Sequence, residues 1–125
     1  MTAWGHLDPA EWISRFIHHA RDWSRAAHLA KPSAFDPGNH PELSVAHIGG
    51  LAEQEIWNLS RHTLSDQPGR EAVLARADLR AGIALAQGLS AVRDNDPFER
   101  HTTISGWPKD ERKRIALELS QAAEL

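Results

Sequence analysis

The spacing of the apolar residues changes at Gly106-Trp107-Pro108, and this change restricts the chain to folds that contain both strands and helices. Before the junction, residues 98–105 alternate in character from one position to the next, which is typical of a strand. After it, Pro108 fits the first turn of a helix, and the apolar stripe of that helix would consist of Ile115, Leu119, Ala122 and Ala123. The pattern predicts a strand that leads into a C-terminal helix over residues 108–124.

The middle of the chain contains the same mixture of strand-like and helical segments. Residues 43–48 (LSVAHI) alternate and end at a Gly-Gly pair, and residues 51–64 carry apolar side chains at helical spacing. Asp94-Asn95-Asp96-Pro97 is typical of a turn, which predicts a hairpin of residues 89–93 and 99–105. The remaining predicted elements are a short strand at 72–77 and a helix that Asp78 caps and that ends at Gln87.

The N-terminal part of the chain fits two interpretations. Asp8-Pro9, followed by Glu11, is typical of a helix start. The residues that follow have large apolar side chains at helical spacing, but ISRFI (13–17) also fits a strand in which Ile13 and Ile17 flank Arg15. Periodicity alone leaves residues 13–28 open between strand and helix.

Length and composition limit the fold and the setting. The 125 residues suit one domain, residues 1–125, and we expect a small α+β fold in which about three helices pack on a short mixed or antiparallel sheet. The chain has no cysteine, which excludes disulfides and Cys-based zinc sites. Its net charge is −3, which argues against broad binding of nucleic acid, and it has no apolar run of membrane-spanning length. We expect a cytoplasmic protein that does not associate with membranes.

Several segments, taken in order, resemble a family of small uncharacterised bacterial proteins that are often found beside mobile elements and defence genes. The resembling segments are ISRFI (13–17), AKPSAF (30–35), ELSVAHIGGLAEQEIW (42–57), ARADL (75–79) and the stretch from ERHTTISGWP to IALEL (99–119). Ala46-His47 stands where the usual form of the third segment has Phe-Arg. The resemblance implies a strand at 13–17 and a bacterial setting, and it implies no particular activity.

Arg100 and His101 are the main candidates for contact with a ligand. In a strand, His101 and Thr103 share one face, and such a face can bind a phosphate or hold a base near a hydroxyl. We predict His101 as a candidate catalytic acid or base, with Arg15 and Arg100 holding anionic oxygens. The predicted ligand-binding residues are Arg15, His47, Arg100 and Thr103. Whether His101 contacts a ligand or only supports the strand stays open.

Other kinds of site have weaker patterns. The adjacent pair His18-His19 does not suit chelation, and no His-Glu-x-x-His or phosphate-binding Gly loop occurs, so we predict no metal ligands and no cofactor. A metal site would need His18, His47 and His101 to meet across the fold. A serine triad would lack the Gly-x-Ser-x-Gly elbow. A basic patch for nucleic acid would combine Arg15, Arg21, Arg25 and Arg100 with Trp23.

Because the sequence contains no assembled catalytic motif, the lead hypothesis is an accessory module that binds a protein partner in a mobile-element or defence context. The alternative is a small phosphate-directed enzyme that acts on nucleotide or nucleic-acid phosphoesters, or in ADP-ribose chemistry, through His101 with Arg15 and Arg100. The sequence does not decide whether the protein is an enzyme, nor its oligomeric state. The enzyme hypothesis requires Arg15 and His101 in one exposed concavity.

Overall fold

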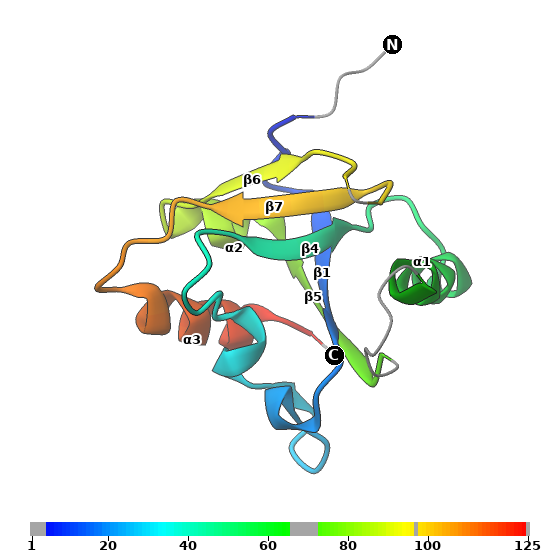
Figure 1. Ribbon diagram of the computed structural model, residues 1–125, viewed down its shortest axis with the longest axis horizontal. Coiled ribbons are helices and arrows are strands. Elements are labelled where there is room, and N and C mark those ends of the chain that lie inside the picture. Colours follow the sequence, from blue (N-terminus) through cyan, green and yellow to red (C-terminus); the bar gives the residue numbers. More distant parts are fainter. Residues whose placement is uncertain (1–4, 66–72, 97, 125) are drawn as a thin grey trace.

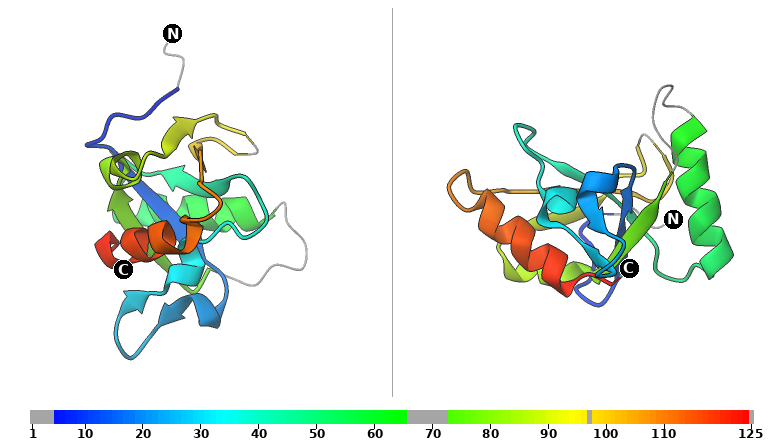
Figure 2. Two further views of the ribbon diagram at one scale, coloured as in Figure 1. Left: turned by 90° about the vertical axis from the view of Figure 1, so that its left-hand side faces the viewer. Right: turned by 90° about the horizontal axis from the view of Figure 1, so that it is seen from below.

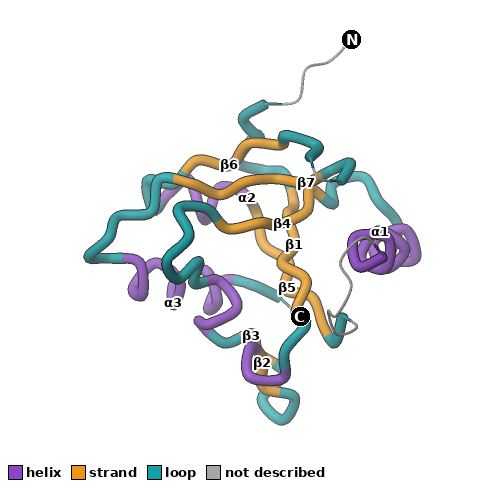
Figure 3. The backbone as a smooth tube through the Cα atoms, viewed as in Figure 1, coloured by secondary structure: helices purple, strands orange, loops and turns teal. Residues whose placement is uncertain are grey.

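The structure, a computed structural model, describes residues 5–65, 73–96 and 98–124. Five strands form one antiparallel sheet in the order β5-β1-β4-β7-β6, and two short strands form a separate ribbon (Figures 1 and 3). The strands are β1 (Trp12–Ile17), β2 (Trp23–Ser24), β3 (Leu29–Ala30), β4 (Leu43–His47), β5 (Ala75–Arg80), β6 (Ser90–Arg93) and β7 (His101–Ser105). The α-helices are α1 (Glu53–Ser65), α2 (Ala81–Ala86) and α3 (Arg112–Ala122), and 3₁₀ helices span Ala20–Asp22 and Pro32–Phe35. The predicted α+β class is confirmed.

The helices cover the two faces of the large sheet unequally. Figure 2 shows α1 on one side of the sheet and α3 on the other, and we call these sides the α1 face and the α3 face. On the α3 face, strand residues such as Ile13, Leu79 and Ile104 form the main core with side chains of α3 and of the Pro32–Phe35 helix. On the α1 face, a smaller cluster joins Ile56 of α1 to Phe16 of β1, Ala46 of β4 and Ile48, which follows β4. No described helix is both long and apolar enough to cross a membrane.

Residues 13–28, which fitted either a strand or a helix, form the strand β1 followed by short turns. β1 lies between β5 and β4 and pairs with both, as the resemblance implied. The helix start predicted at Asp8 is wrong, because Asp8 Oδ1 accepts a hydrogen bond from the Ala10 backbone N–H at 2.9 Å within a turn. β1 buries Ile13 and Ile17 on one face and Ser14 and Phe16 on the other, so burial on both sides outweighs the helical spacing.

The boundary predicted between the strand at 72–77 and the helix at 78–87 is also wrong. β5 extends to Arg80, and Asp78 lies inside it, opposite Ser14 of β1. α2 therefore begins at Ala81 and has no side-chain cap from Asp78. The pairing of β5 with the whole of β1 outweighs the local capping preference of an aspartate. Residue 72 lies outside the described residues.

The predicted hairpin and C-terminal helix are present with shorter bounds. β6 and β7 pair in the register Ser90↔Ser105 to Arg93↔Thr102. α3 begins at Arg112 rather than at Pro108, because residues 108–111 form a turn in which the Glu111 N–H donates to the Pro108 carbonyl at 3.2 Å. Trp107 packs against the main core and its Nε1 donates to the Ile104 carbonyl at 3.0 Å, so the Gly-Trp-Pro junction makes the predicted turn from strand to helix.

Short segments pair with both edge strands of the large sheet. Beside β6, the Leu7 N–H donates to the Ala91 carbonyl and the Arg93 N–H donates to the Gly5 carbonyl, both at 2.9 Å. Beside β5, Asp78 and Glu124 exchange two backbone hydrogen bonds of 2.7 and 2.8 Å. These pairings cover edge groups that another strand could otherwise bind.

Candidate functional site

A polar cluster on the α1 face is centred on His101, the first residue of β7. The His101 ring nitrogens lie 2.5 Å (Nδ1) from Asp94 Oδ1 and 3.1 Å (Nε2) from Ser44 Oγ. Ser44 comes from β4 and is exposed, whereas Asp94 directly follows β6. The register places these groups together, since Ala46 lies opposite His101 and Ser44 lies opposite Thr103 on the same face. The imidazole of β7 therefore joins a serine of β4 to an aspartate in the turn after β6.

The contacts of His101 define the tautomer of its neutral ring. An ionised carboxylate can only accept, so Nδ1 carries the proton that is donated to Asp94. Nε2 is then an acceptor for the Ser44 hydroxyl. Phe98 packs edge-on against the imidazole, with ring centroids 5.1 Å apart. The ring is held by three neighbours while its basic nitrogen faces an exposed hydroxyl.

Thr103, a predicted ligand-binding residue, strengthens this arrangement through Asp94. Its hydroxyl donates to Asp94 Oδ2 at 2.6 Å, so the two carboxylate oxygens have separate donors. Burial by itself raises the pKa of Asp94, but the hydrogen bonds from Thr103 and His101 outweigh burial and hold this pKa below its ordinary value. Asp94 is therefore ionised at neutral pH and orients His101.

A second cluster, centred on His47, lies on the α3 face. His47 shares that face with Ile13, its partner in β1, and both His47 and Arg93 are almost fully buried. His47 Nε2 lies 2.7 Å from Glu11 Oε2, and Nδ1 accepts from an Arg93 guanidinium nitrogen at 2.9 Å. Arg93 Nε also donates to Asn95 Oδ1 at 2.8 Å. The predicted ligand-binding residue His47 thus belongs to a buried network.

Arg15 and Arg100 do not join His101 in one site. Arg15 Nε donates to the Ala34 carbonyl at 2.8 Å and its NH1 to the Ser44 carbonyl at 2.9 Å, and the side chain lies on the α3 face. Arg100 NH1 donates to the carbonyls of His47 at 2.9 Å and Gly49 at 3.1 Å. Both guanidinium groups hold backbone carbonyls, so the structure does not assemble the anion clamp of the phosphate-directed hypothesis.

Arg100 also borders a groove between α1 and the loop that follows β6. The groove has a volume of about 510 Å³ and is lined by Leu51, Glu55, Asn58, Leu59, Glu99 and Arg100. Two carboxylates among these side chains oppose an anionic ligand. The groove therefore does not restore a phosphate site around Arg100.

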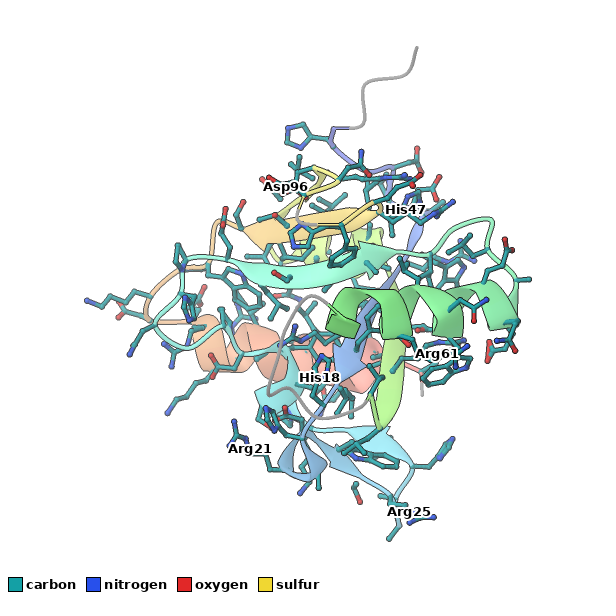
Figure 4. All side chains as sticks on the ribbon, turned by 45° about the vertical axis from the view of Figure 1, so that its right-hand side comes forward. His18, Arg21, Arg25, His47, Arg61 and Asp96 are labelled. Carbon is teal, nitrogen blue, oxygen red and sulfur yellow. The ribbon has the colours of Figure 1, made fainter. Side chains whose placement is uncertain are left out.

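The other predicted sites are not assembled in the described part of the chain. No three His, Asp or Glu side chains there are grouped so that they could hold a metal ion. Figure 4 places Arg21 and Arg25 around the β2–β3 ribbon, at the opposite end of the molecule from His47. Because Arg100 NH1 is bound to the His47 carbonyl, Arg100 lies far from those two arginines. A patch that contains all four predicted arginines is therefore not assembled.

Sequence reasoning missed Ser44 and Asp94 as partners of His101. Asp94 fitted a turn, and Ser44 was one of several small residues in an alternating strand. Ser44 and His101 are 57 positions apart, so only the pairing of β4 with β7 brings them together. Only a comparison of the possible strand registers, made to see which of them place a Ser and an Asp beside His101, could have found them in the sequence.

No protein-family model, curated protein or solved structure matches this chain. The chain's own geometry separates a buried histidine network on the α3 face from an accessible Ser-His-Asp chain on the α1 face. The second of these is the arrangement that can act on a molecule outside the protein.

Proposed function

We propose that this protein is a small binding module that acts through a protein partner, and that the partner docks on the α1 face beside α1. The docking surface consists of side chains from β4, β6 and β7, which we call the open strip: Ser44, Ser90, Val92, Thr103 and Ser105. The observation that carries the proposal is that this strip is uncharged and that none of its side chains is buried.

The composition of the open strip favours association. Small and β-branched side chains lose little rotamer freedom when a partner covers them, whereas long charged side chains lose much more. The β5 part of the same face differs, because it carries Arg76, Asp78 and Arg80. A partner that docks on β4, β6 and β7 would cover the Asp94 carboxylate, which accepts from Thr103, and few other charged groups, and few charges are typical of the centre of an interface.

The loop after β6 indicates the charge of the partner. Asp94, Asp96 and Glu99 are exposed there, while the neighbouring Arg93 is buried and Arg100 NH1 is bound to backbone carbonyls. An acidic rim beside an uncharged strip complements a partner surface with Lys or Arg at one side. We propose a cytoplasmic partner encoded near this protein, in the bacterial mobile-element or defence context that the resemblance implies.

The test is site-directed cross-linking in cells of the source organism. A photo-reactive amino acid in place of Ser90 should give one discrete adduct, and the same group in place of Leu117, exposed on α3, is the matched control. Asp96→Lys should weaken the adduct from position 90 because it reverses a rim charge. Equal adducts from positions 90 and 117, or none from position 90, would show that the open strip is not a docking surface.

A further inference from the structure

We infer that Ser44 is a nucleophile and that the chain Ser44–His101–Asp94 catalyses acyl transfer from small carboxylic esters. This inference goes beyond partner binding and concerns the protein without its partner, because a partner docked on the open strip would cover Ser44. It follows from geometry in which Ser44 Oγ is 3.1 Å from His101 Nε2, and His101 Nδ1 is 2.5 Å from Asp94 Oδ1. Nucleophile, base and orienting carboxylate are the three groups that an activated serine requires.

The accessibility of the three groups fits these roles. Ser44 is exposed, so an ester can reach Oγ, whereas His101 is 6% exposed and its ring is fixed by Asp94 and Phe98. The ionised carboxylate of Asp94 can stabilise the imidazolium that forms when Nε2 takes a proton. Thr103 holds the second carboxylate oxygen and so limits rotation of Asp94.

The position of Ser44 defines the class of substrate. Ser44 lies within β4, between β1 and β7, and not at a helix N-terminus, which is the usual place for oxyanion donors. A site of this kind suits esters with good leaving groups better than amides, because departure of the leaving group needs less stabilisation of the tetrahedral intermediate. Thr103 lies opposite Ser44 and Val92 lies opposite Thr103, and Ser44 does not line the groove described above, so the acyl group would be small.

The reaction balances with the ester and water alone. Ser44 Oγ attacks the carbonyl carbon while its proton passes to His101 Nε2. The bond between carbonyl carbon and ester oxygen breaks, His101 returns the proton to that oxygen, and an alcohol leaves. Water then gives a proton to His101 Nε2 and attacks the acyl-serine. The bond between the carbonyl carbon and Ser44 Oγ breaks, His101 returns the proton to Oγ, and the carboxylic acid leaves.

The test uses the full-length protein and a fluorophosphonate probe, which a serine nucleophile attacks at phosphorus with loss of fluoride. Peptide mass spectrometry should find the adduct on Ser44. His101→Ala should slow labelling at least a hundredfold, since a positioned general base contributes about 10² to 10⁴. Asp94→Asn should also slow it, and Ser33→Ala, at an exposed serine of the Pro32–Phe35 helix, should not. An unlabelled Ser44, or a Ser44 labelled equally fast in wild type and His101→Ala, overturns the inference.

A second measurement covers the case in which His101→Ala does not fold. The chain has no cysteine, so Ser44→Cys and Ser33→Cys each introduce a single thiol at an exposed position. An adjacent imidazole promotes the thiolate, so iodoacetamide at pH 6 should alkylate Ser44→Cys at least ten times faster than Ser33→Cys. Equal alkylation rates at the two positions would overturn the inference.

Discussion

His47 and His101 are neighbours in the sheet, yet their side chains lie on opposite faces and have different hydrogen-bond partners. The His47 N–H donates to the carbonyl of Arg100 at 2.8 Å, so their backbones are joined, but their rings lie on different faces. His47 gives its proton from Nε2 to Glu11 and accepts from Arg93, whereas His101 gives its proton from Nδ1 to Asp94 and accepts from Ser44. A carboxylate selects the tautomer in both cases, and the group at the other nitrogen decides what the ring can do.

Both histidines are buried and their carboxylate partners, Glu11 and Asp94, are each 38% exposed, so the clusters differ in solvent access at the third group, which is Arg93 in one and Ser44 in the other. Arg93 and His47 are 4% and 3% exposed, so water cannot replace a partner that is lost there. Asp94 and Ser44 are exposed, so water can solvate both when His101 is removed. We expect the His47 cluster to support the fold and the His101 cluster to be available for contacts with other molecules.

The largest effect is expected for Arg93→Met. The substitution leaves His47 Nδ1 and Asn95 Oδ1 without the Arg93 donors, and the free energy of unfolding should fall by about 3 kcal/mol. Urea unfolding at pH 7 measures it, with Arg114→Met on the exposed side of α3 as a control that stays within about 0.5 kcal/mol. A loss below about 1 kcal/mol would mean that the His47 cluster contributes no more to the stability of the fold than the His101 cluster does.

A smaller loss is expected for His101→Ala. Asp94 keeps its hydrogen bond from Thr103, and Ser44 faces water, so the free energy of unfolding should fall by about 1 kcal/mol. His47→Ala is the matched comparison, and it should lose more because it leaves a buried Arg93 without the His47 acceptor. If His101→Ala destabilises as much as His47→Ala, both histidines are structural.

Arg100 lies between the two clusters, and substitutions there test the backbone conformation that joins them. It has a φ of +76°, a conformation that glycine adopts with less strain than other residues. Arg100→Gly and Arg100→Ala both remove the hydrogen bonds to the His47 and Gly49 carbonyls. Arg100→Gly should therefore be more stable than Arg100→Ala by about 1 kcal/mol. The opposite order would indicate that this φ is not retained in solution.

The smallest effect concerns pH. The folded-state pKa of Asp94 is below its ordinary value of 3.8, so ionised Asp94 contributes stability that is fully present above about pH 3.8 and is lost as the pH falls through the lower folded value. Because the side chain is 38% exposed, solvent weakens this contribution. Unfolding between pH 7 and pH 3 should show a shallower acid loss for Asp94→Asn than for wild type. Parallel curves would mean that Thr103 and His101 do not lower this pKa.

The sequence was informative where local patterns and tertiary contacts agree. Ile115 and Leu119 of the C-terminal helix are buried as predicted, and the hairpin of β6 and β7 closes at the predicted turn. It was misleading at Asp8 and Asp78, which have good helix-capping chemistry but lie in a turn and in a strand. Pairing of β5 with β1 decides the position of Asp78, and its partners are distant in sequence, whereas Asp8 lies in a turn before β1 begins at Trp12.

The candidate site was predicted only in part. Alternation correctly placed His101 and Thr103 on one face, since these residues share Asp94. It could not show that Arg15 points to the other face. That placement depends on which residues of β1 and β4 lie opposite each other, and the sequence of residues 13–17 does not specify this pairing. Nor could it show Ser44 beside His101, which depends on the pairing of two strands from distant parts of the chain.

The backbone pairing at both edges of the sheet has a consequence for self-association. Gly5, Leu7 and Glu124 occupy hydrogen-bonding groups of β6 and β5 that would otherwise be free to extend the sheet. A second molecule could not add a strand there without first displacing these segments, so growth into fibrils or strand-swapped chains is opposed at both ends.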